Sequence, residues 1–149
     1  MIDYDDMFKR IRHAQEVLKT VAKKTPVDRS TAFSEMTGGK VYLKLENLQR
    51  TGSFKVRGAT YAISQLTQTQ KSAGVIADSA GNHAQGVALA ASQMGIKCTI
   101  VMPMFSPVAK IQATRSYGAN VVLHGVAFDD ALAEATRISE GTGATFIHP

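Results

Sequence analysis

One lysine in this sequence stands among small residues immediately before a predicted helix. It is Lys55, in the segment TGSFKVRGA over residues 51–59, and the helix is expected over 56–66. A lysine in a partly apolar setting loses some of its preference for the charged form. The neutral amine can then attack an aldehyde and form a Schiff base. The pattern leaves two interpretations, a nucleophilic lysine and a surface lysine near a helix start, and by itself favours the second. Arg57 either holds an anion or, as the pattern favours, forms a salt bridge on the helix surface.

A second segment, SAGNHAQG over residues 79–86, joins a predicted strand at 74–77 to a predicted helix at 82–94. Backbone N–H groups at a helix start lack intrahelical acceptors, and the helix dipole is positive there. In a parallel sheet this turn also lies at the carboxyl edge of the strands, where ligands usually bind. The segment therefore predicts a site for a carboxylate or a phosphate, or else an ordinary tight turn. Asn82 binds a ligand oxygen in the first case and caps the helix in the second.

The elements that must position these two segments alternate between strands and helices. Strands are expected at 74–77, 98–102, 120–123 and 144–147, with helices between them at 82–94, 108–118 and 128–141. Strands separated by helices of this length pair in parallel through right-handed crossovers. The predicted fold class is therefore α/β, a small doubly wound parallel sheet flanked by helices.

The N-terminal part of the chain has a different pattern. An amphipathic helix is expected over 5–24, followed by a short helix at 30–36 and a strand at 41–45. The apolar residues that share one face of the first helix are Met7, Ile11, Ala14, Leu18 and Val21. Such a stripe predicts a face packed on the core, or equally half of a contact between two copies of the chain.

Composition and charge exclude several classes of protein. The chain has 149 residues, is 44% hydrophobic and 19% charged, and carries a net charge of +5, as one globular domain would. The basic residues are scattered, so the charge favours small anionic ligands and does not indicate a nucleic-acid partner. The longest apolar run, at 86–91, is too short to cross a membrane.

Cysteine and histidine content indicates the redox compartment of the protein and whether a metal site is expected. Cys98 is the only cysteine, so no disulfide forms within the chain, and a reducing compartment fits best. The acidic N-terminus lacks the apolar stretch of a secretory signal, and the expected location is cytoplasmic. The four histidines, at 13, 83, 124 and 148, show no metal-ligand spacing, so no metal site is predicted.

Together, the two segments resemble the lysine motif and the substrate loop of the threonine dehydratases, enzymes that depend on pyridoxal phosphate (PLP). The first match is KLENLQRTGSFKVRGA at 44–59, and the second is SAGNHAQGVA at 79–88. Their order and separation agree with this family as well. The likeness continues in 101–103, Lys110, 118–125 and 146–149, and covers the chain from Thr25 onward. The resemblance implies a fold-type II PLP enzyme of the threonine/serine dehydratase branch, a lyase of isoleucine biosynthesis or of threonine catabolism.

The resemblance implies a role for each residue of the two segments. Lys55 would bind PLP as a Schiff base and then move the α-proton of the substrate, while Phe54 would pack on the pyridine ring. Asn82 would bind the 3′-oxygen of the cofactor. The substrate carboxylate would be held by the side chain of Ser79 and by the backbone and helix start at Ala80, Gly81, Asn82 and His83. L-Threonine would yield 2-oxobutanoate and ammonia, and L-serine would yield pyruvate and ammonia.

Two positions distinguish this sequence within the resemblance. The related serine racemases, an alternative parent for this chain, carry a hydroxyl residue at the position of Ala80. An alanine cannot donate a proton to the opposite face of the substrate carbanion, so Ala80 favours elimination over racemisation. Asp78 stands where the family more often has a small or hydroxyl residue. A carboxylate there would repel a bound anion unless it points away or has a cationic partner.

Length is the other departure from the family. Family members run to more than twice the 149 residues of this chain, and their glycine-rich loop for the PLP phosphate lies beyond the equivalent of Pro149. The expected division is 1–55 as the start of the large PLP domain and 56–149 as the small domain. The isolated chain is expected to be inactive or nearly so, and the full-length parent to act on a small amino acid as a homo-oligomer. The alternative from another class is a non-enzymatic truncated product that acts as an interaction module.

Overall fold

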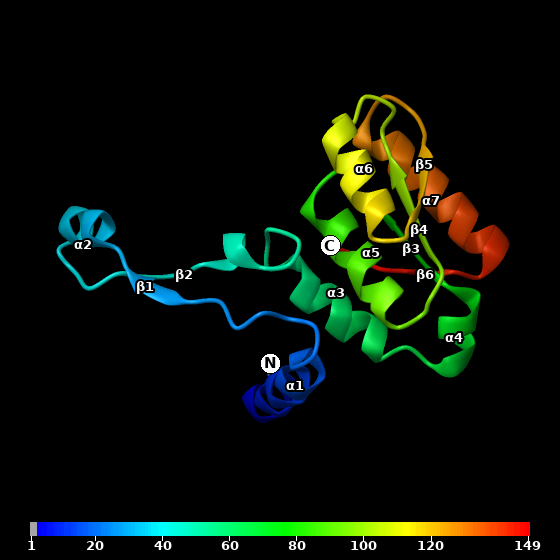
Figure 1. Cartoon of the computed structure of the whole chain (residues 1–149). Coiled ribbons are helices and arrows are strands. Elements are labelled where there is room, and N and C mark those ends of the chain that lie inside the picture. The colour runs from blue at the N-terminus through cyan, green and yellow to red at the C-terminus, as the bar shows by residue number, and fades with distance from the viewer. Residues whose placement is uncertain (1–2) are drawn as a thin grey trace.

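The computed structural model describes residues 3–149 and is built around a four-stranded parallel sheet (Figure 1). Its strands are β3 (Val75–Asp78), β4 (Cys98–Met102), β5 (Asn120–Leu123) and β6 (Thr145–Phe146). They lie in the order β5-β4-β3-β6, and every neighbouring pair is parallel. All four strands that the sequence pattern predicts are therefore present, and they pair as expected.

Helices cover both faces of this sheet. α5 (Asn82–Gln93) and α6 (Val108–Ser116) pack on one face, and α7 (Phe128–Thr142) packs on the other. The chain winds from β3 outward to β5, and α7 then crosses the opposite face to place β6 beside β3. This arrangement confirms the predicted doubly wound α/β fold. The strand order reverses between β3 and β6, which is where ligands bind in open sheets of this kind.

Two apolar clusters hold the helices on the sheet. The central strands β3 and β4 are buried on both faces, so their sequences are nearly continuous apolar runs. On one face Ala77 and Ile100 pack against α5, which is rich in buried alanine and therefore lies close to the strands. On the other face Ile76 packs against Ala131 and Ala135 of α7. The sheet is thus a rigid support for the turns at its carboxyl edge.

Two helices precede the sheet in the chain. α3 (Lys55–Ser64) corresponds to the helix expected at 56–66 and packs against α5. α4 (Gln68–Ala73) lies outside the predicted elements. It begins with a capping box, in which the Thr67 hydroxyl accepts from the Gln70 N–H and the Gln70 side chain accepts from the Thr67 N–H. The helix is too short for an apolar period to be visible, and only this cap marks it in the sequence.

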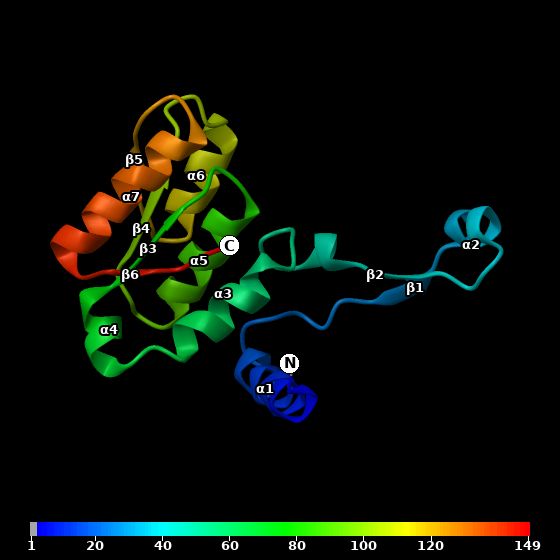
Figure 2. The same cartoon turned by 180° about the vertical axis from the view of Figure 1, so that it is seen from behind.

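An arm extends away from the sheet between α1 and α3 (Figure 1, and from behind in Figure 2). β1 (Val27–Arg29) and β2 (Tyr42–Lys44) pair antiparallel, and α2 (Thr31–Thr37) lies at the tip. The single 3₁₀ turn η1 (Glu46–Leu48) leads from the arm toward α3. The helix and the second strand were expected, whereas β1 was not. Every residue of the two strands is exposed.

α1 (Tyr4–Leu18) is shorter than the helix expected over 5–24. The cause is a tertiary contact. The Gln49 side chain accepts a hydrogen bond from the Lys23 N–H at 2.8 Å and donates one to the Lys23 carbonyl at 2.9 Å. These bonds hold the stretch after α1 in a non-helical conformation. Val21 is buried there, outside the helix.

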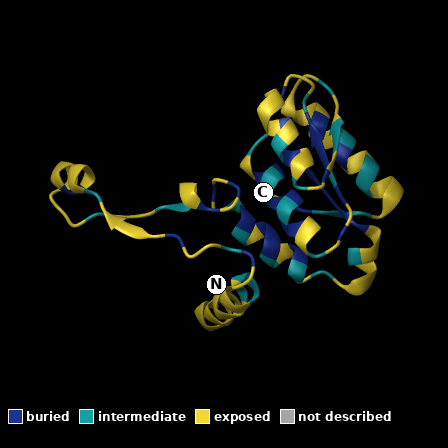
Figure 3. Ribbon diagram, in the orientation of Figure 1, coloured by how far each residue is buried: buried dark blue, intermediate teal, exposed yellow. Residues whose placement is uncertain are grey.

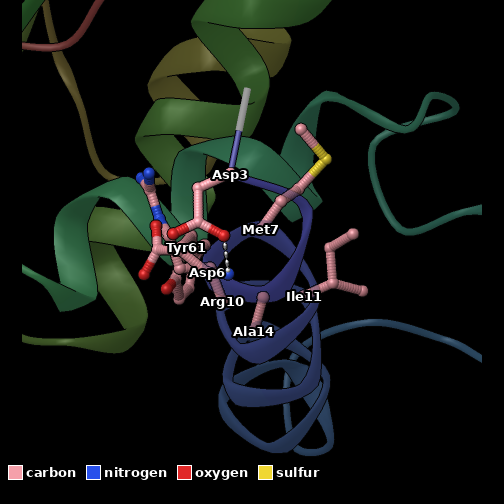
Figure 4. A pocket seen from close by; sticks show the side chains of 7 residues that line it. All are labelled: Asp3, Asp6, Met7, Arg10, Ile11, Ala14 and Tyr61. Carbon is pink, nitrogen blue, oxygen red and sulfur yellow. Dashed lines mark hydrogen bonds between the residues drawn. The ribbon is translucent and has the colours of Figure 1, made fainter. Parts of the chain in front are cut away.

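The apolar stripe of α1 is not a core face in this structure. No residue of α1 is buried, and the side chains of Met7 and Ile11 are 43% and 58% exposed. Together with Ala14 and Tyr61 they line an open cavity of about 420 Å³ between α1 and α3 (Figure 4). The interpretation of this stripe as a core face is therefore wrong within this chain. A contact between two copies stays a prediction.

The extent of burial differs between the sheet with its helices and the N-terminal part of the chain. Buried residues concentrate in the sheet, α3 and α5, while α1 and the arm are largely exposed (Figure 3). Ile63, Ile76, Ile100 and Met102 are the largest fully buried apolar side chains. None of the helices within residues 3–149 combines the length and hydropathy needed to span a bilayer.

Candidate active site

Lys55 is the first residue of α3, and Phe54 precedes it at the N-cap position. The Lys55 side chain is half-buried, and its Nζ lies 5.9 Å from the centre of the Phe54 ring. The Phe54 side chain itself is 60% exposed. Within the described chain, no carboxylate forms an ion pair with Lys55 Nζ. The amine is therefore available to a ligand, next to an aromatic ring that a flat ligand could stack on.

Gly86 lets α5 approach the start of α3 very closely. A Cβ at this position would lie 3.0 Å from the Lys55 carbonyl carbon and 3.0 Å from the Val56 nitrogen. Only glycine fits there without a shift of backbone atoms. Gly86 is one helical turn after Asn82, so the two share a face of α5. The contact therefore brings together the two segments that the sequence singled out, Lys55 and the turn that begins α5.

The turn between β3 and α5 leaves the start of the helix without a side-chain cap. The Ser79 hydroxyl accepts a hydrogen bond from the Gly81 N–H at 3.1 Å, and Gly81 occupies the N-cap position. Asn82 is the first residue of the helix, and its side chain is exposed and does not cap it. The capping interpretation of Asn82 is therefore wrong, and ligand binding by its amide stays a prediction. The first N–H groups of α5 have no side-chain cap and lie at the positive end of the helix dipole.

His83 ties this turn to the neighbouring strand. Its side chain is buried, and Nε2 donates a hydrogen bond to the Ile147 carbonyl at 2.8 Å, just beyond β6. A carbonyl can only accept, so the proton is on Nε2. Burial lowers the pKa of the imidazole, and the positive charge of Lys55 acts in the same direction. The His83 side chain is thus committed to the fold, which leaves only its backbone N–H for the role that the resemblance implies.

We expect the His83 imidazole to titrate below the ordinary pKa of 6.5. Because folding favours the neutral ring, protonation favours the unfolded chain, and stability decreases as the pH falls below 6.5. The Cε1–H resonance of His83, followed by NMR through a pH titration, measures this directly. The variant His83→Gln, unfolded in urea at about pH 7.5 and about pH 5, should lose less stability on acidification than the native chain. A midpoint above 6.5 for His83 would contradict the assignment.

Asp78 is the last residue of β3 and stands directly before the turn. It is only 2% exposed, and its Oδ2 atom has no hydrogen-bond partner. Burial raises the pKa of the carboxyl, while the backbone N–H of Asp78 itself and the charges of His83 and His148 act against that rise. No lysine or arginine within residues 3–149 forms an ion pair with the Asp78 carboxyl.

Arg57 forms a salt bridge with Glu46. Its Nε and Nη2 atoms bind the two carboxylate oxygens at 2.8 Å each, and the Thr25 hydroxyl donates to Oε1 at 2.6 Å. The hydrogen bond from Arg57 is the main reason that the pKa of Glu46 falls from 4.5 to about 2. The salt-bridge interpretation of Arg57 is confirmed, although the partner was not foreseen. Glu46 and Thr25 are distant from Arg57 in sequence, and no local pattern marks them.

Other chemically versatile groups have no place in this site. Cys98 is buried in β4, and its burial raises the pKa of the thiol to about 12, so it is an inert core residue. Across residues 3–149, no three side chains of His, Cys, Asp or Glu are grouped so that they could hold a metal ion.

Comparison with known proteins shows the family to which the chain belongs. Residues 18–149 match the family described as pyridoxal-phosphate dependent enzyme. L-Threonine ammonia-lyase of Thermotoga maritima is 55% identical over 139 residues, which are 93% of this chain and 35% of that protein. L-Threonine dehydratase catabolic TdcB of Staphylococcus aureus is 49% identical over 140 residues, which are 93% of this chain and 40% of that protein. The chain thus spans two fifths or less of the length of these relatives.

Solved structures agree with the sequence comparison. The processed form of threonine deaminase isoform 2 from Solanum lycopersicum matches with a TM-score of 0.90 and 40% identity, over 99% of this chain and 41% of that one. Maize serine racemase matches with a TM-score of 0.88 and 38% identity, over 95% of this chain and 43% of that one. The resemblance to threonine dehydratases and to part of a fold-type II PLP enzyme is thereby confirmed. The chain belongs to the pyridoxal-phosphate dependent enzyme family.

Proposed function

We propose that this chain supplies the lysine and the substrate-binding turn of an enzyme that uses PLP to convert L-threonine to 2-oxobutanoate and ammonia, and that also accepts L-serine. The observation that carries this proposal is the contact at Gly86, which sets Lys55 beside the start of α5. An amino-acid substrate needs both partners at once, an amine-binding centre at its nitrogen and an anion site at its carboxylate. The relatives named threonine ammonia-lyase and threonine dehydratase support this substrate class.

The residues around Lys55 fit PLP on the side of its aldehyde and ring. PLP supplies an aldehyde carbon that bonds to amines and a ring that accepts electrons from the substrate α-carbon. Lys55 Nζ would bond to that carbon, and the exposed Phe54 ring, 5.9 Å from Nζ, would cover one face of the pyridine. The exposed Asn82 amide would bind the ring oxygen. We assign the cofactor phosphate to none of these residues.

The remaining residues of the site would orient the substrate. The Ser79 hydroxyl and the N–H groups over 80–83 would hold the carboxylate at the positive end of α5. This would fix the Cα–H bond toward Lys55, whose Nζ would take the proton. The β-hydroxyl then leaves as water, and one water adds to the carbon that carries nitrogen. The products are 2-oxobutanoate and ammonia, with no net consumption of water.

Elimination is favoured over racemisation by one side chain. The fold of maize serine racemase is also similar to this chain, so a racemase parent is the nearest alternative. Ala80, half-buried in the turn, has no hydroxyl that could deliver a proton to the second face of the substrate. We therefore expect D-serine not to form from L-serine at the completed site.

Lysine labelling tests the proposal. The purified chain is mixed with PLP, reduced with borohydride and digested, and the modified peptide is identified by mass. We expect one stoichiometric adduct on Lys55 and none in the variant Lys55→Ala. The variant Lys40→Ala, which removes an exposed lysine of the arm, should label like the native chain. Labelling scattered over many lysines, or absent from Lys55, would overturn the assignment of Lys55.

The chain on its own is expected to release little or no 2-oxobutanoate from L-threonine, because it covers only 35% to 40% of the relatives that carry this name. A coupled assay for 2-oxobutanoate on the pure protein measures this. Sustained turnover would contradict this expectation and would show that the reaction needs no residues beyond those of this chain.

A second candidate function is a non-catalytic interaction module. It is favoured by the apolar side chains that α1 and the arm expose, among them Tyr4 at 75%, Phe8 at 62% and Met36 at 78%. Surfaces of this kind mark contacts with other chains. A monomer in sedimentation, together with no retention of a full-length threonine dehydratase on the immobilised chain, would argue against this function.

A further inference from the structure

α1 carries opposite charges at its two ends. The side chains concerned are all exposed: Asp3, Asp5 and Asp6 at its start, and Lys19, Lys23 and Lys24 beyond its last residue. Within residues 3–149, Asp5 and Asp6 form no ion pair with any basic side chain, and Lys23 and Lys24 form none with any carboxylate. Both ends of the helix therefore have charge that is available to a partner.

An exposed apolar face connects these two ends. It consists of Tyr4, Met7, Phe8 and Ile11, which recur every three or four residues and therefore share one side of α1. Tyr4, Phe8 and Ile11 are each more than half exposed. The side chains of Met7 and Ile11 point away from Tyr61 of α3 (Figure 4). α3 thus leaves this face uncovered, and exposed apolar patches of this kind mark contacts with other chains.

Two hollows lie along α1 and meet at its middle. The cavity of about 420 Å³ is at the start of the helix, where Asp3, Asp6 and Arg10 are among the residues that line it. A groove of about 640 Å³ is at the other end, and its basic lining residues are Lys19, Lys23, Lys24, Lys44 and Arg57. Ile11 and Ala14 line both hollows. The surface is therefore acidic at one end, apolar in the middle and basic at the other end.

A surface with this order of charges is complementary to itself. In two identical chains related by a two-fold axis, the same patch of each chain faces the other in the opposite direction. An axis near Ile11 and Ala14 would set the acidic start of each α1 against the basic end of the other α1. The apolar faces of the two helices would then meet in the middle. The helix dipoles are opposed in this antiparallel arrangement, which favours it further.

We propose that two copies of this chain associate through α1, with the two helices antiparallel and their exposed apolar faces buried against each other. The occupant of the cavity and of the groove is thus α1 of a second copy. Lys23 and Lys24 of each chain would face Asp5 and Asp6 of the other chain. Every such attraction occurs twice in the dimer because of the two-fold symmetry. The inference does not depend on the proposed reaction, since neither Lys55 nor the turn that begins α5 takes part in the contact.

Sedimentation equilibrium across a dilution series measures the dissociation constant of the dimer, and two charge reversals test its arrangement. The double variant Asp5→Lys with Asp6→Lys makes both ends of α1 basic, and Lys23→Glu with Lys24→Glu makes both ends acidic. Each should dimerise at least about tenfold more weakly than the native chain, because like charges then meet at both ends. An equal mixture of the two should form a heterodimer about as stable as the native dimer. A variant whose α1 was merely damaged would not recover on mixing.

Controls separate this contact from general effects of charge and hydropathy. The double variant Lys40→Glu with Lys97→Glu, which reverses two exposed lysines outside α1, should dimerise like the native chain. Ile11→Gln, next to the two-fold axis, should weaken the dimer about tenfold, whereas Val126→Gln, an equally exposed position before α7, should not. A native chain that is monomeric at every concentration, reversed variants that dimerise like the native chain, or a mixture without heterodimer would each overturn the inference.

Discussion

Replacement of Gly86 by valine is expected to destabilise the fold by about 2–3 kcal/mol and to reduce the yield of the PLP adduct at Lys55. The physical reason is the contact between α5 and α3. The first added carbon would already lie 3.0 Å from backbone atoms of Lys55 and Val56, and the two further methyl groups of valine need still more room. Backbone atoms cannot rotate aside as a flexible side chain can. The start of α3 must therefore move away from α5 and carry Lys55 with it.

A matched control is available in α3 itself. Gly58 also lies inside a helix, but it is exposed, and a Cβ there would meet nothing within 4 Å. The variant Gly58→Ala should therefore stabilise the chain by about 0.5–1 kcal/mol through the better helix propensity of alanine. Urea unfolding measures both variants, and borohydride reduction with PLP measures the adduct. If Gly86→Val kept both the stability and the adduct yield of the native chain, the contact would not position Lys55.

Replacement of Glu46 by glutamine is expected to cost about 2 kcal/mol of stability at neutral pH, because it removes the charged partner of Arg57 and weakens the bond to Thr25. This pair joins η1 and the stretch after α1 to the start of α3. The pKa of Glu46 is about 2 in the folded chain against an ordinary value of 4.5. Its contribution is therefore fully present above pH 4.5 and is lost as the pH falls from 4.5 toward 2.

Urea unfolding at a series of pH values measures this effect. The native chain should lose stability steadily below pH 4.5, and Glu46→Gln should lose less, since it has no carboxylate to protonate at this position. The variant Glu16→Gln is the control. Glu16 pairs with Lys19 on α1, where both side chains are 64% exposed, and its loss should leave the free energy of unfolding unchanged within error. Equal behaviour of the two variants would mean that the Glu46 pair does not stabilise the fold.

The sheet and its helices were predictable because their patterns are local. The run over 98–102 is apolar except for Thr99 and becomes a strand buried on both faces, with the predicted bounds. The alternation of such runs with helices of ten or more residues fixed the parallel pairing. The turn at 79–83 was predictable for the same reason, since its position at a strand end and a helix start follows from the order of the elements.

The errors arose where a distant residue decides the local structure. The apolar period of the first helix continues to Val21. The Gln49 side chain, however, forms two hydrogen bonds with the backbone of Lys23, and the helix ends at Leu18. The same period could not reveal that Met7 and Ile11 line an open cavity instead of the core. In the site, the pattern marked Asn82 as a possible N-cap of the helix. The backbone geometry shows that Gly81 is the N-cap residue, which the sequence alone does not reveal. The partner of Arg57 is similarly invisible in a single sequence.

The arm can open without the four-stranded sheet. β1 and β2 form a sheet of their own, and a two-stranded ribbon without a packed face is only marginally stable. Its backbone hydrogen bonds can break in a local fluctuation while β3 and β4 stay paired. We therefore expect the arm and the four-stranded sheet to open as separate units. The amide protons of Ser30 and Leu45 bond to the carbonyls of Val41 and Pro26 within the arm. We expect them to exchange with solvent through small local openings, and those of the central strands to exchange only when the whole sheet unfolds.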